Sequence, residues 1–221
     1  MDTQNYENVA HPYVGDPSVK TPAVLHVITG LGIGGAEGVL VDLALSKRAP
    51  ARPVAVAALV ADGPNRAKLE SGGTLVIDIG MARGRPSVRG LLKLARVIRE
   101  IRPDVVQSWM YHADLTSLFA LWLSGRRTKT RLLWSIRCSD MDPRQYGTMF
   151  RMVLWLWAKL ARYADAVIAN SDAGVDVHRA LGMRARAVLR IDNGLDTYRF
   201  RPDAEARARV RNELGISGDM I

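Results

Sequence analysis

The chain has 221 residues, 48% of them hydrophobic, which is enough to bury a sizeable core and excludes a chain that is mainly disordered. Its 31 Lys and Arg residues against 22 Asp and Glu give a net charge of +9, which permits contact with nucleic acid or an anionic membrane but also follows from an Arg-rich proteome. The single cysteine, Cys138, excludes an intrachain disulfide and a zinc site built from several cysteines.

The first twenty residues are polar and lack the apolar segment of a signal peptide. We expect residues 1–20 to form a mobile N-terminal extension. No apolar run along the chain approaches the ~20 residues of a membrane-spanning helix. The sequence therefore predicts a cytoplasmic protein.

Short apolar runs alternate with amphipathic segments along the rest of the chain. The runs predict strands at residues 23–29, 53–60, 75–79, 104–108, 131–136, 166–169 and 186–191. Apolar residues at helical spacing predict helices at residues 35–46, 87–101, 112–123, 146–163, 171–181 and 204–214. Continuous apolar strands that alternate with helices are typical of parallel sheets covered on both faces. We therefore predict an α/β fold with a doubly wound, mostly parallel, Rossmann-like sheet of six or seven strands.

A glycine-rich loop joins the first expected strand to the first expected helix. Gly30, Gly32 and Gly35 fit the pattern G-x-G-x-x-G, in which unobstructed backbone N–H groups at a helix N-terminus can accept a phosphate. Nicotinamide-binding folds also place an acidic residue about 20 positions further on. Residues 49–52 contain none and Asp62 comes later, which disfavours an oxidoreductase. A tight strand-to-helix turn without a ligand stays an alternative for this loop.

Four motifs follow one another along the chain. They are Gly34-Gly35-Ala36-Glu37 before an apolar helix, RPDVVQSWMYHA at residues 102–113, ADAVIANS at residues 164–171, and RIDNGLD at residues 190–196 with FRP at residues 200–202. In this order and spacing they resemble the N-terminal domain of family 4 glycosyltransferases with the GT-B fold. The resemblance covers roughly residues 23–215.

The resemblance implies that residues 21–200 form an acceptor-side domain and that residues 201–221 begin the linker to a second domain, which this sequence lacks. In that family the second domain binds the nucleotide-diphospho-sugar and carries the pair of glutamates that contact it. The catalytic residues are therefore not assigned in this chain, and we expect weak or no transferase activity from it alone. The resemblance also implies a reaction without a metal or another cofactor.

The resemblance further implies roles for individual residues at the cleft. The backbone of Gly34 and Gly35 would approach the donor diphosphate, and Glu37, His112 and Arg137 would lie at the cleft on the acceptor side. Arg137 stands where some relatives have a histidine, and because an arginine stays protonated it can neutralise a diphosphate but not act as a base. For these three side chains the alternatives are a carboxylate that stabilises a helix N-terminus, a structural histidine and an ordinary surface arginine.

Four basic residues recur at helical spacing on one face of the helix expected at residues 87–101: Arg89, Lys93, Arg96 and Arg99. This face is either simply solvated or directed to an anionic bilayer, which would place the protein on the inner face of the membrane. In the helix expected at residues 146–163, Trp155 and Trp157 are expected in the core, with an interface as the alternative. His26 in the first strand is also expected in the core.

The combined expectation is one half of a glycosyltransferase that transfers a sugar from a nucleotide-diphospho-sugar to a hydroxyl group with retention. The acceptor would be a glycan or a lipid-linked molecule, in cell-envelope or exopolysaccharide synthesis. The alternative is a non-catalytic Rossmann module that binds a nucleotide or a lipid. Nucleic acid is not an expected partner, because only the net charge favours it.

Overall fold

The structure is a computed structural model that describes residues 22–46, 55–82, 84–85, 87–195, 197 and 200–216. The extension expected at residues 1–20 and the start of the strand expected at residues 53–60 lie outside the described residues.

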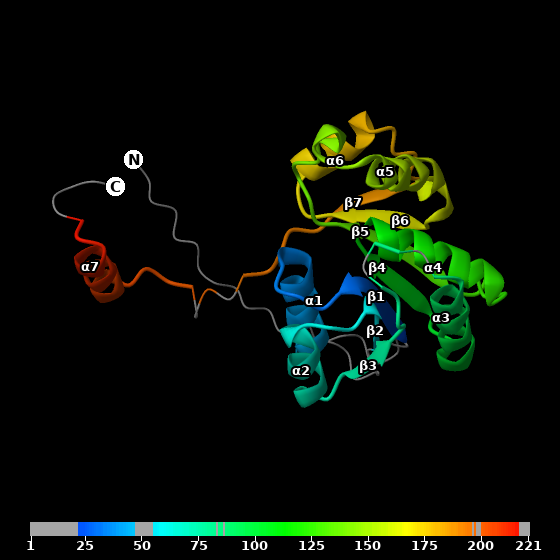
Figure 1. Ribbon diagram of the computed structural model, residues 1–221, viewed down its shortest axis with the longest axis horizontal. Coiled ribbons are helices and arrows are strands. Elements are labelled where there is room, and N and C mark those ends of the chain that lie inside the picture. Colours follow the sequence, from blue (N-terminus) through cyan, green and yellow to red (C-terminus); the bar gives the residue numbers. More distant parts are fainter. Residues whose placement is uncertain are drawn as a thin grey trace, which may run out of the picture.

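Within these residues, seven parallel strands form one sheet in the order β3-β2-β1-β4-β5-β6-β7 (Figure 1). The strands are β1 (Val24–Gly30), β2 (Ala55–Val60), β3 (Leu75–Asp78), β4 (Val105–Trp109), β5 (Arg131–Ile136), β6 (Ala166–Ala169) and β7 (Val188–Arg190). The apolar runs form buried strands because helices cover both faces, so side chains on either face of a central strand leave water. The predicted α/β, doubly wound sheet is confirmed, and it is parallel throughout.

The helices are α1 (Gly35–Leu45), α2 (Pro64–Ser71), α3 (Val88–Ile101), α4 (Tyr111–Leu123), α5 (Thr148–Leu160), α6 (Asp172–Ala180) and α7 (Ala204–Glu213), with short 3₁₀ turns η1 (Pro143–Gln145) and η2 (Ala161–Tyr163). Figure 1 shows α1 and α2 on one face of the sheet and α3 and α4 on the other. The apolar side chains of α3 to α6 share one core cluster, and those of α1 and α2 belong to a second cluster.

The start and the end of α3 show why the sequence predicted this helix well. The Ser87 hydroxyl accepts a hydrogen bond from the Gly90 backbone N–H at 3.1 Å, as an N-cap residue does. At the other end Arg102 adopts a left-handed conformation with φ 51°, and Pro103 follows. The helix therefore ends where its backbone turns away from α-helical geometry.

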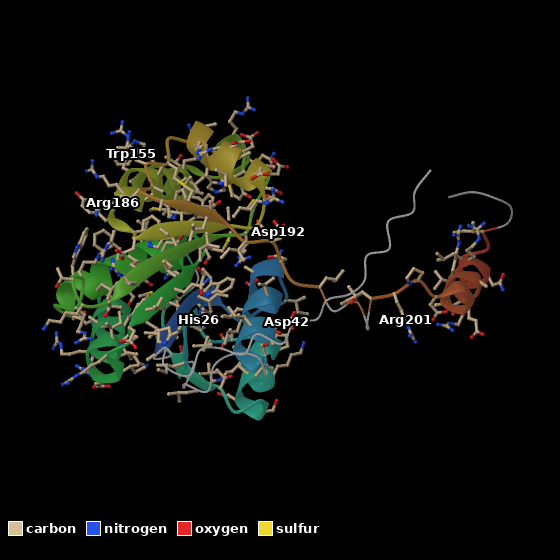
Figure 2. All side chains as sticks on the ribbon, turned by 180° about the vertical axis from the view of Figure 1, so that it is seen from behind. His26, Asp42, Trp155, Arg186, Asp192 and Arg201 are labelled. Carbon is tan, nitrogen blue, oxygen red and sulfur yellow. The ribbon has the colours of Figure 1, made fainter. Side chains whose placement is uncertain are left out.

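Two expectations about helices were wrong. The sequence did not predict α2, and the long helix expected at residues 146–163 ends at Leu160 and continues as the 3₁₀ turn η2. On α5, Trp157 is buried as expected, whereas Trp155 is 63% exposed and therefore lies outside the core. Figure 2 shows Trp155 at the periphery of the molecule.

A fully buried carboxyl group ties α4 to its neighbours. Asp114 accepts hydrogen bonds from the Ser108 hydroxyl at 2.6 Å and from the Trp157 indole N–H at 2.7 Å, and the Ser135 backbone also bonds to it. These partners lie on β4, α5 and β5. One side chain thus fixes the position of α4 on the sheet and against α5.

A second buried link joins α4 to α6. The His178 ring lies 2.7 Å from the Gly174 carbonyl oxygen through Nδ1 and 2.7 Å from the Tyr111 hydroxyl through Nε2. Because a carbonyl only accepts, Nδ1 carries the proton, and the Tyr111 hydroxyl donates to Nε2 of the neutral ring. Burial lowers the pKa of His178, which favours this neutral form.

The buried carboxyl group of Asp114 predicts that stability falls as pH rises above neutrality. Burial raises the pKa of Asp114 to about 8, although the hydrogen bonds from Ser108 and Trp157 oppose the shift. Between pH 4 and 8 the folded chain therefore holds a proton that the unfolded chain has released, so this contribution is lost as pH rises through that window. The histidines whose pKa values burial lowers act in the opposite direction, but only below about pH 6.5.

From pH 6.5 to 8 we expect the free energy of unfolding to fall by about 1 kcal/mol per pH unit. Urea denaturation at several pH values measures this slope. The Asp114→Asn variant cannot ionise at this position and should lose most of the slope, whatever its absolute stability. An equal slope in the parent and the variant would contradict the assignment.

Candidate functional site

The candidate site lies at the edge of the sheet where the strands end. From β1 the strand order runs one way through β2 to β3 and the other way from β4 to β7, so it reverses between β1 and β4. Doubly wound sheets bind ligands outside the carboxyl ends of the strands at such a point. The glycine-rich loop follows β1, α4 begins directly after β4, and Arg137 follows β5. The sequence therefore brings all of its expected cleft residues to this one edge.

The segment after β2 holds the glycine-rich loop in place. The Asn65 side-chain amide donates to the Gly32 carbonyl oxygen at 2.6 Å, and the Asn65 backbone N–H donates to the Leu31 carbonyl at 3.2 Å. Gly63, with φ 134°, lies so close that a Cβ there would overlap the Leu31 carbonyl oxygen. Sequence reasoning missed these contacts. The available signal was the segment Asp62-Gly63-Pro64-Asn65, in which proline opens α2.

The loop presents exposed backbone at the N-terminus of α1. Gly34 is the N-cap with an extended backbone, Gly35 is the first helical residue, and both are exposed. The Glu37 carboxylate lies against Gly34, so that a side chain at position 34 would displace it. A carboxylate in the first turn is stabilised by the helix dipole, which accounts for Glu37 without a ligand.

A buried tryptophan supports Arg137. Trp109, the last residue of β4, is fully buried and donates through its indole N–H to Nδ1 of His26 at 3.3 Å. His26 lies within the sheet (Figure 2), as expected for a core residue, and burial lowers its pKa to about 4. The guanidinium carbon of Arg137 lies 4.8 Å from the centroid of the Trp109 ring. Neutral His26 and Trp109 thus form the base on which Arg137 rests.

Arg137 is held in position from two sides. In addition to the contact with Trp109, its Nη1 donates to the Asn193 side-chain oxygen at 2.7 Å. Burial lowers the pKa of Arg137, yet an arginine keeps its charge at neutral pH. Among the described residues its Nε has no hydrogen-bond partner. Arg137 is therefore a half-buried cation that Trp109 and Asn193 hold in position.

His112 lies in the first turn of α4 and is half-buried against Phe150, with ring centroids 5.8 Å apart. Burial lowers its pKa, which keeps the ring neutral near pH 7. Its neighbours Trp109, Tyr111 and Asp114 are all buried in the core, so they do not form an acceptor pocket with it.

The backbone before α4 is strained. Met110, the N-cap of α4, has φ 71° and ψ 160°, a conformation that is nearly confined to glycine. Its N–H donates to the Ser135 carbonyl at 3.2 Å, which anchors the turn to β5. Such strain persists where the surrounding structure imposes it and is concentrated at functional sites. It lies at the same edge as Arg137 and His112.

An apolar cavity of about 510 Å³ opens beside His112. Its lining comes from α3, α4 and α5, from the carboxyl ends of β1 and β2 and from the segment between β3 and α3, with Leu91, Leu115, Phe119, Val153 and Leu156 among the lining side chains. Sequence reasoning did not predict it, because the lining residues are distant in the chain and come from two strands, a connecting segment and three helices.

The four basic residues expected on one face of a helix lie exposed on α3, opposite the buried Leu94 and Ile98. They are Arg89, Lys93, Arg96 and Arg99, and Arg99 also donates to the Leu123 carbonyl at 3.2 Å. No helix among the described residues is long and apolar enough to cross a membrane. In the same part of the chain, no three His, Cys, Asp or Glu side chains are grouped as metal ligands would be.

One argument against a dinucleotide-binding oxidoreductase was wrong in its detail. Strand β2 ends at Val60, so Asp62 lies close to the end of the second strand, where a dinucleotide-binding fold has its acidic residue. Spacing from the glycines was misleading because a long segment separates α1 from β2.

The sequence model of glycosyltransferase family 4 matches residues 33–199. Similar solved structures include HepE from Anabaena in complex with UDP and glucose, with 22% identity, 88% of this chain and 50% of that chain covered, and a TM-score of 0.66. A glycosyltransferase from Rickettsia africae is 14% identical, with 90% of this chain and 51% of that chain covered and a TM-score of 0.60. Sucrose-phosphate synthase from Thermosynechococcus elongatus is 16% identical, with 89% of this chain and 53% of that chain covered and a TM-score of 0.57. No curated protein sequence matches the chain.

At these identities the structural likeness concerns the fold, and the chain spans about half the length of the structures it matches. The family model, by contrast, covers most of the chain, from the glycine-rich loop to the segment after β7. The chain belongs to glycosyltransferase family 4 and has the Rossmann-like fold of a GT-B domain.

Proposed function

We propose that this chain forms the acceptor-side half of an enzyme that transfers a sugar from a nucleotide-diphospho-sugar to a hydroxyl group with retention, in cell-envelope or exopolysaccharide synthesis. The observation that carries the proposal is the meeting of an exposed glycine loop, the N-terminus of α1 and the positioned Arg137 at one edge of the sheet. The crystallised complex of HepE with UDP and glucose supports a nucleotide-sugar donor.

In this proposal the charge of the diphosphate determines the roles of the residues. The backbone N–H groups of Gly34 and Gly35 face the diphosphate at the positive end of α1. Arg137 neutralises the negative charge that develops on the leaving diphosphate, and its support by Trp109 means that little reorganisation is needed. The Glu37 carboxylate turns away from Gly34 when the diphosphate binds, because like charges repel.

His112 lies on the acceptor side in this proposal. Its neutral ring can accept a hydrogen bond from the hydroxyl group that is to be glycosylated. The other wall of the cleft would come from a second domain. Catalysis by proximity requires both walls, so we expect this chain to show weak or no turnover by itself.

Binding of UDP to this chain tests the proposal directly. We expect weak but measurable binding by isothermal titration, and an Arg137→Met variant should bind UDP about tenfold more weakly, because a charge-assisted contact is lost. The matched control is Arg151→Met, which removes an exposed arginine of α5 and should leave the affinity unchanged.

Two results would count against this account. Equal UDP affinity in the parent and Arg137→Met would remove Arg137 from the donor site. Turnover by the isolated chain at the level of an intact glycosyltransferase, on panels of nucleotide-sugars and acceptors, would show that a second wall is not needed.

We also propose that the basic face of α3 contacts an anionic membrane surface. Each exposed cation should contribute about 1 kcal/mol near such a surface. The chain should therefore sediment with phosphatidylglycerol vesicles at low salt, not with neutral vesicles, and less at physiological salt, where the Debye length is ~8 Å.

The variant for this test replaces Arg89, Lys93 and Arg96 by Glu and keeps Arg99, because Arg99 also bonds to α4. It should lose the sedimentation with anionic vesicles. If binding survives these three changes, α3 is not the anchor, and a Trp155→Ser variant then tests the exposed tryptophan of α5.

A further inference from the structure

The apolar cavity beside His112 has the size of a ligand site and offers very little to a polar ligand. Its volume of about 510 Å³ falls within the ~300–1,000 Å³ that small-molecule sites occupy. Of its three side-chain hydroxyl groups two are engaged, since Thr116 donates to the His112 carbonyl at 2.7 Å and Ser87 caps α3, and only the Thr29 hydroxyl at the end of β1 has no partner among the described residues. A sugar placed inside would exchange its hydrogen bonds to water for contacts with carbon. The lining, which is apolar apart from a few groups, therefore favours an occupant that is mostly hydrocarbon.

The topology gives this cavity a direction. All strands are parallel and each helix follows a strand, so α3, α4 and α5 begin near the carboxyl edge of the sheet and run away from it. Lining residues at the start of these helices, Val88, His112 and Met149, therefore lie at the edge, whereas Phe119 and Leu156 lie deeper. From Met149 to Leu156 the depth is about 10 Å at the rise of an α-helix.

The edge of the cavity is both exposed and cationic. Val88 is 75% exposed and Met149 is 65% exposed, although both line the cavity. Arg85, in the segment between β3 and α3, also lines it and is exposed. An apolar interior behind an exposed cation is complementary to an amphiphile that has a hydrocarbon chain and an anionic headgroup.

The surface beside this opening also favours a lipid. Met152 is 61% exposed and follows Met149 by one helical turn on α5, and Trp155 follows on the same side. Exposed large apolar side chains grouped in this way mark surfaces that contact a membrane or another protein. A bilayer that supplies the amphiphile would contact this exposed apolar group of α5.

We propose that this cavity holds the hydrocarbon chain of a phosphate-linked lipid acceptor. The chain lies between α3, α4 and α5, the phosphate lies beside Arg85, and the headgroup emerges at the carboxyl edge, where His112 faces the hydroxyl group to be glycosylated. The acceptor role rests on the proposed function, whereas the binding of the lipid does not. The cavity thus narrows the acceptor class from any hydroxyl compound to a lipid-linked one.

Farnesyl phosphate below its micelle concentration is a suitable probe for isothermal titration of the 221-residue chain. We expect it to bind at least about 100-fold more tightly than inorganic phosphate, because most of the contact is apolar. The Arg85→Met variant should bind farnesyl phosphate about tenfold more weakly than the parent does, and its affinity for the uncharged farnesol should be unchanged. Preference for inorganic phosphate or for a free sugar over farnesyl phosphate would overturn the proposal.

A variant that fills the cavity tests the location. Val153→Phe adds volume inside the cavity, where the hydrocarbon chain would lie. This variant should therefore bind both farnesyl phosphate and farnesol at least tenfold more weakly than the parent does. Val177→Phe makes the same change on α6, at a partly buried position outside the cavity lining, and should have no effect. Equal affinity in Val153→Phe and the parent would place the chain of the lipid elsewhere.

Cross-linking keeps the proposal testable if Val153→Phe does not fold, which circular dichroism reveals. A diazirine analogue of farnesyl phosphate should label α4 or α5 of the parent at residues 115–119 or 149–156, and labelling confined to other segments would overturn the proposal. Failure of UDP binding with intact lipid binding would refute the donor-side roles proposed for Gly34, Gly35 and Arg137 and leave the lipid site. Failure of lipid binding alone would refute only this inference.

Discussion

Replacing Asp114 by alanine is expected to lower the free energy of unfolding by about 3 kcal/mol or more. The substitution leaves the Trp157 indole N–H buried without an acceptor and leaves the Ser108 hydroxyl only the Leu133 carbonyl oxygen at 3.4 Å. Each unsatisfied buried donor costs about 1–3 kcal/mol, and an alanine also leaves a small void. The loss should appear in urea denaturation at pH 6.5 as a lower midpoint.

The control for this prediction is Asp42→Ala, which removes an exposed carboxylate from α1 and should change the stability by about half a kcal/mol or less. A loss in Asp114→Ala as small as that of the control would mean that β4, α4 and α5 are held together without this carboxyl group.

Replacing Gly63 by alanine is expected to destabilise the chain by about 2 kcal/mol or more and to disturb the glycine-rich loop. Gly63 has φ 134° and ψ 160°, and a Cβ would lie 2.8 Å from the Gly32 backbone nitrogen, in addition to overlapping the Leu31 carbonyl. Both atoms belong to the backbone, so neither can move without moving the loop. UDP affinity should therefore fall together with stability.

Gly73→Ala provides a matched comparison. Gly73 also has a positive φ, 83°, but a Cβ there would meet open space. The Gly73→Ala variant should lower the free energy of unfolding by about 1 kcal/mol, because of backbone strain alone, and should leave the UDP affinity unchanged. If the two variants behaved alike, the close approach of Gly63 to the loop would have no consequence for binding.

The strands could be predicted from the sequence because a strand buried on both faces needs a continuous apolar run, and each run ends at polar or glycine residues. The helix α2 could not be predicted in the same way. Its buried positions are Asn65 and Leu69, so a single apolar residue represents its buried face and no helical period emerges. The exposure of Trp155 could not be predicted for a related reason. Apolar residues surround α5 on most sides, so the pattern does not say which side faces the sheet.

The candidate site was predictable in its position but not in its construction. The predicted alternation of parallel strands and helices places Gly34, His112 and Arg137 just after strand ends, and therefore at one edge of the sheet. The support of Arg137 by Trp109 and Asn193 joins segments far apart in the chain, and no local pattern encodes it. The cavity is equally non-local, because two strand ends, the segment between β3 and α3 and three helices form it together.

The position of β1 inside the sheet, between β2 and β4, has a consequence for folding during synthesis. One edge of β1 pairs with β2, and the other edge pairs with β4, which is synthesised much later. Beside the second pairing, the Ala23 backbone N–H donates to the Asp104 carboxylate, and these two residues are 81 positions apart. At a synthesis rate of ~5–20 residues per second, about 4 to 16 seconds separate the emergence of the two partners. During that time the nascent chain carries an apolar strand with an open hydrogen-bonding edge, the kind of surface that pairs with other chains. The slowest and most aggregation-prone stage of folding should therefore end when β4 emerges from the ribosome.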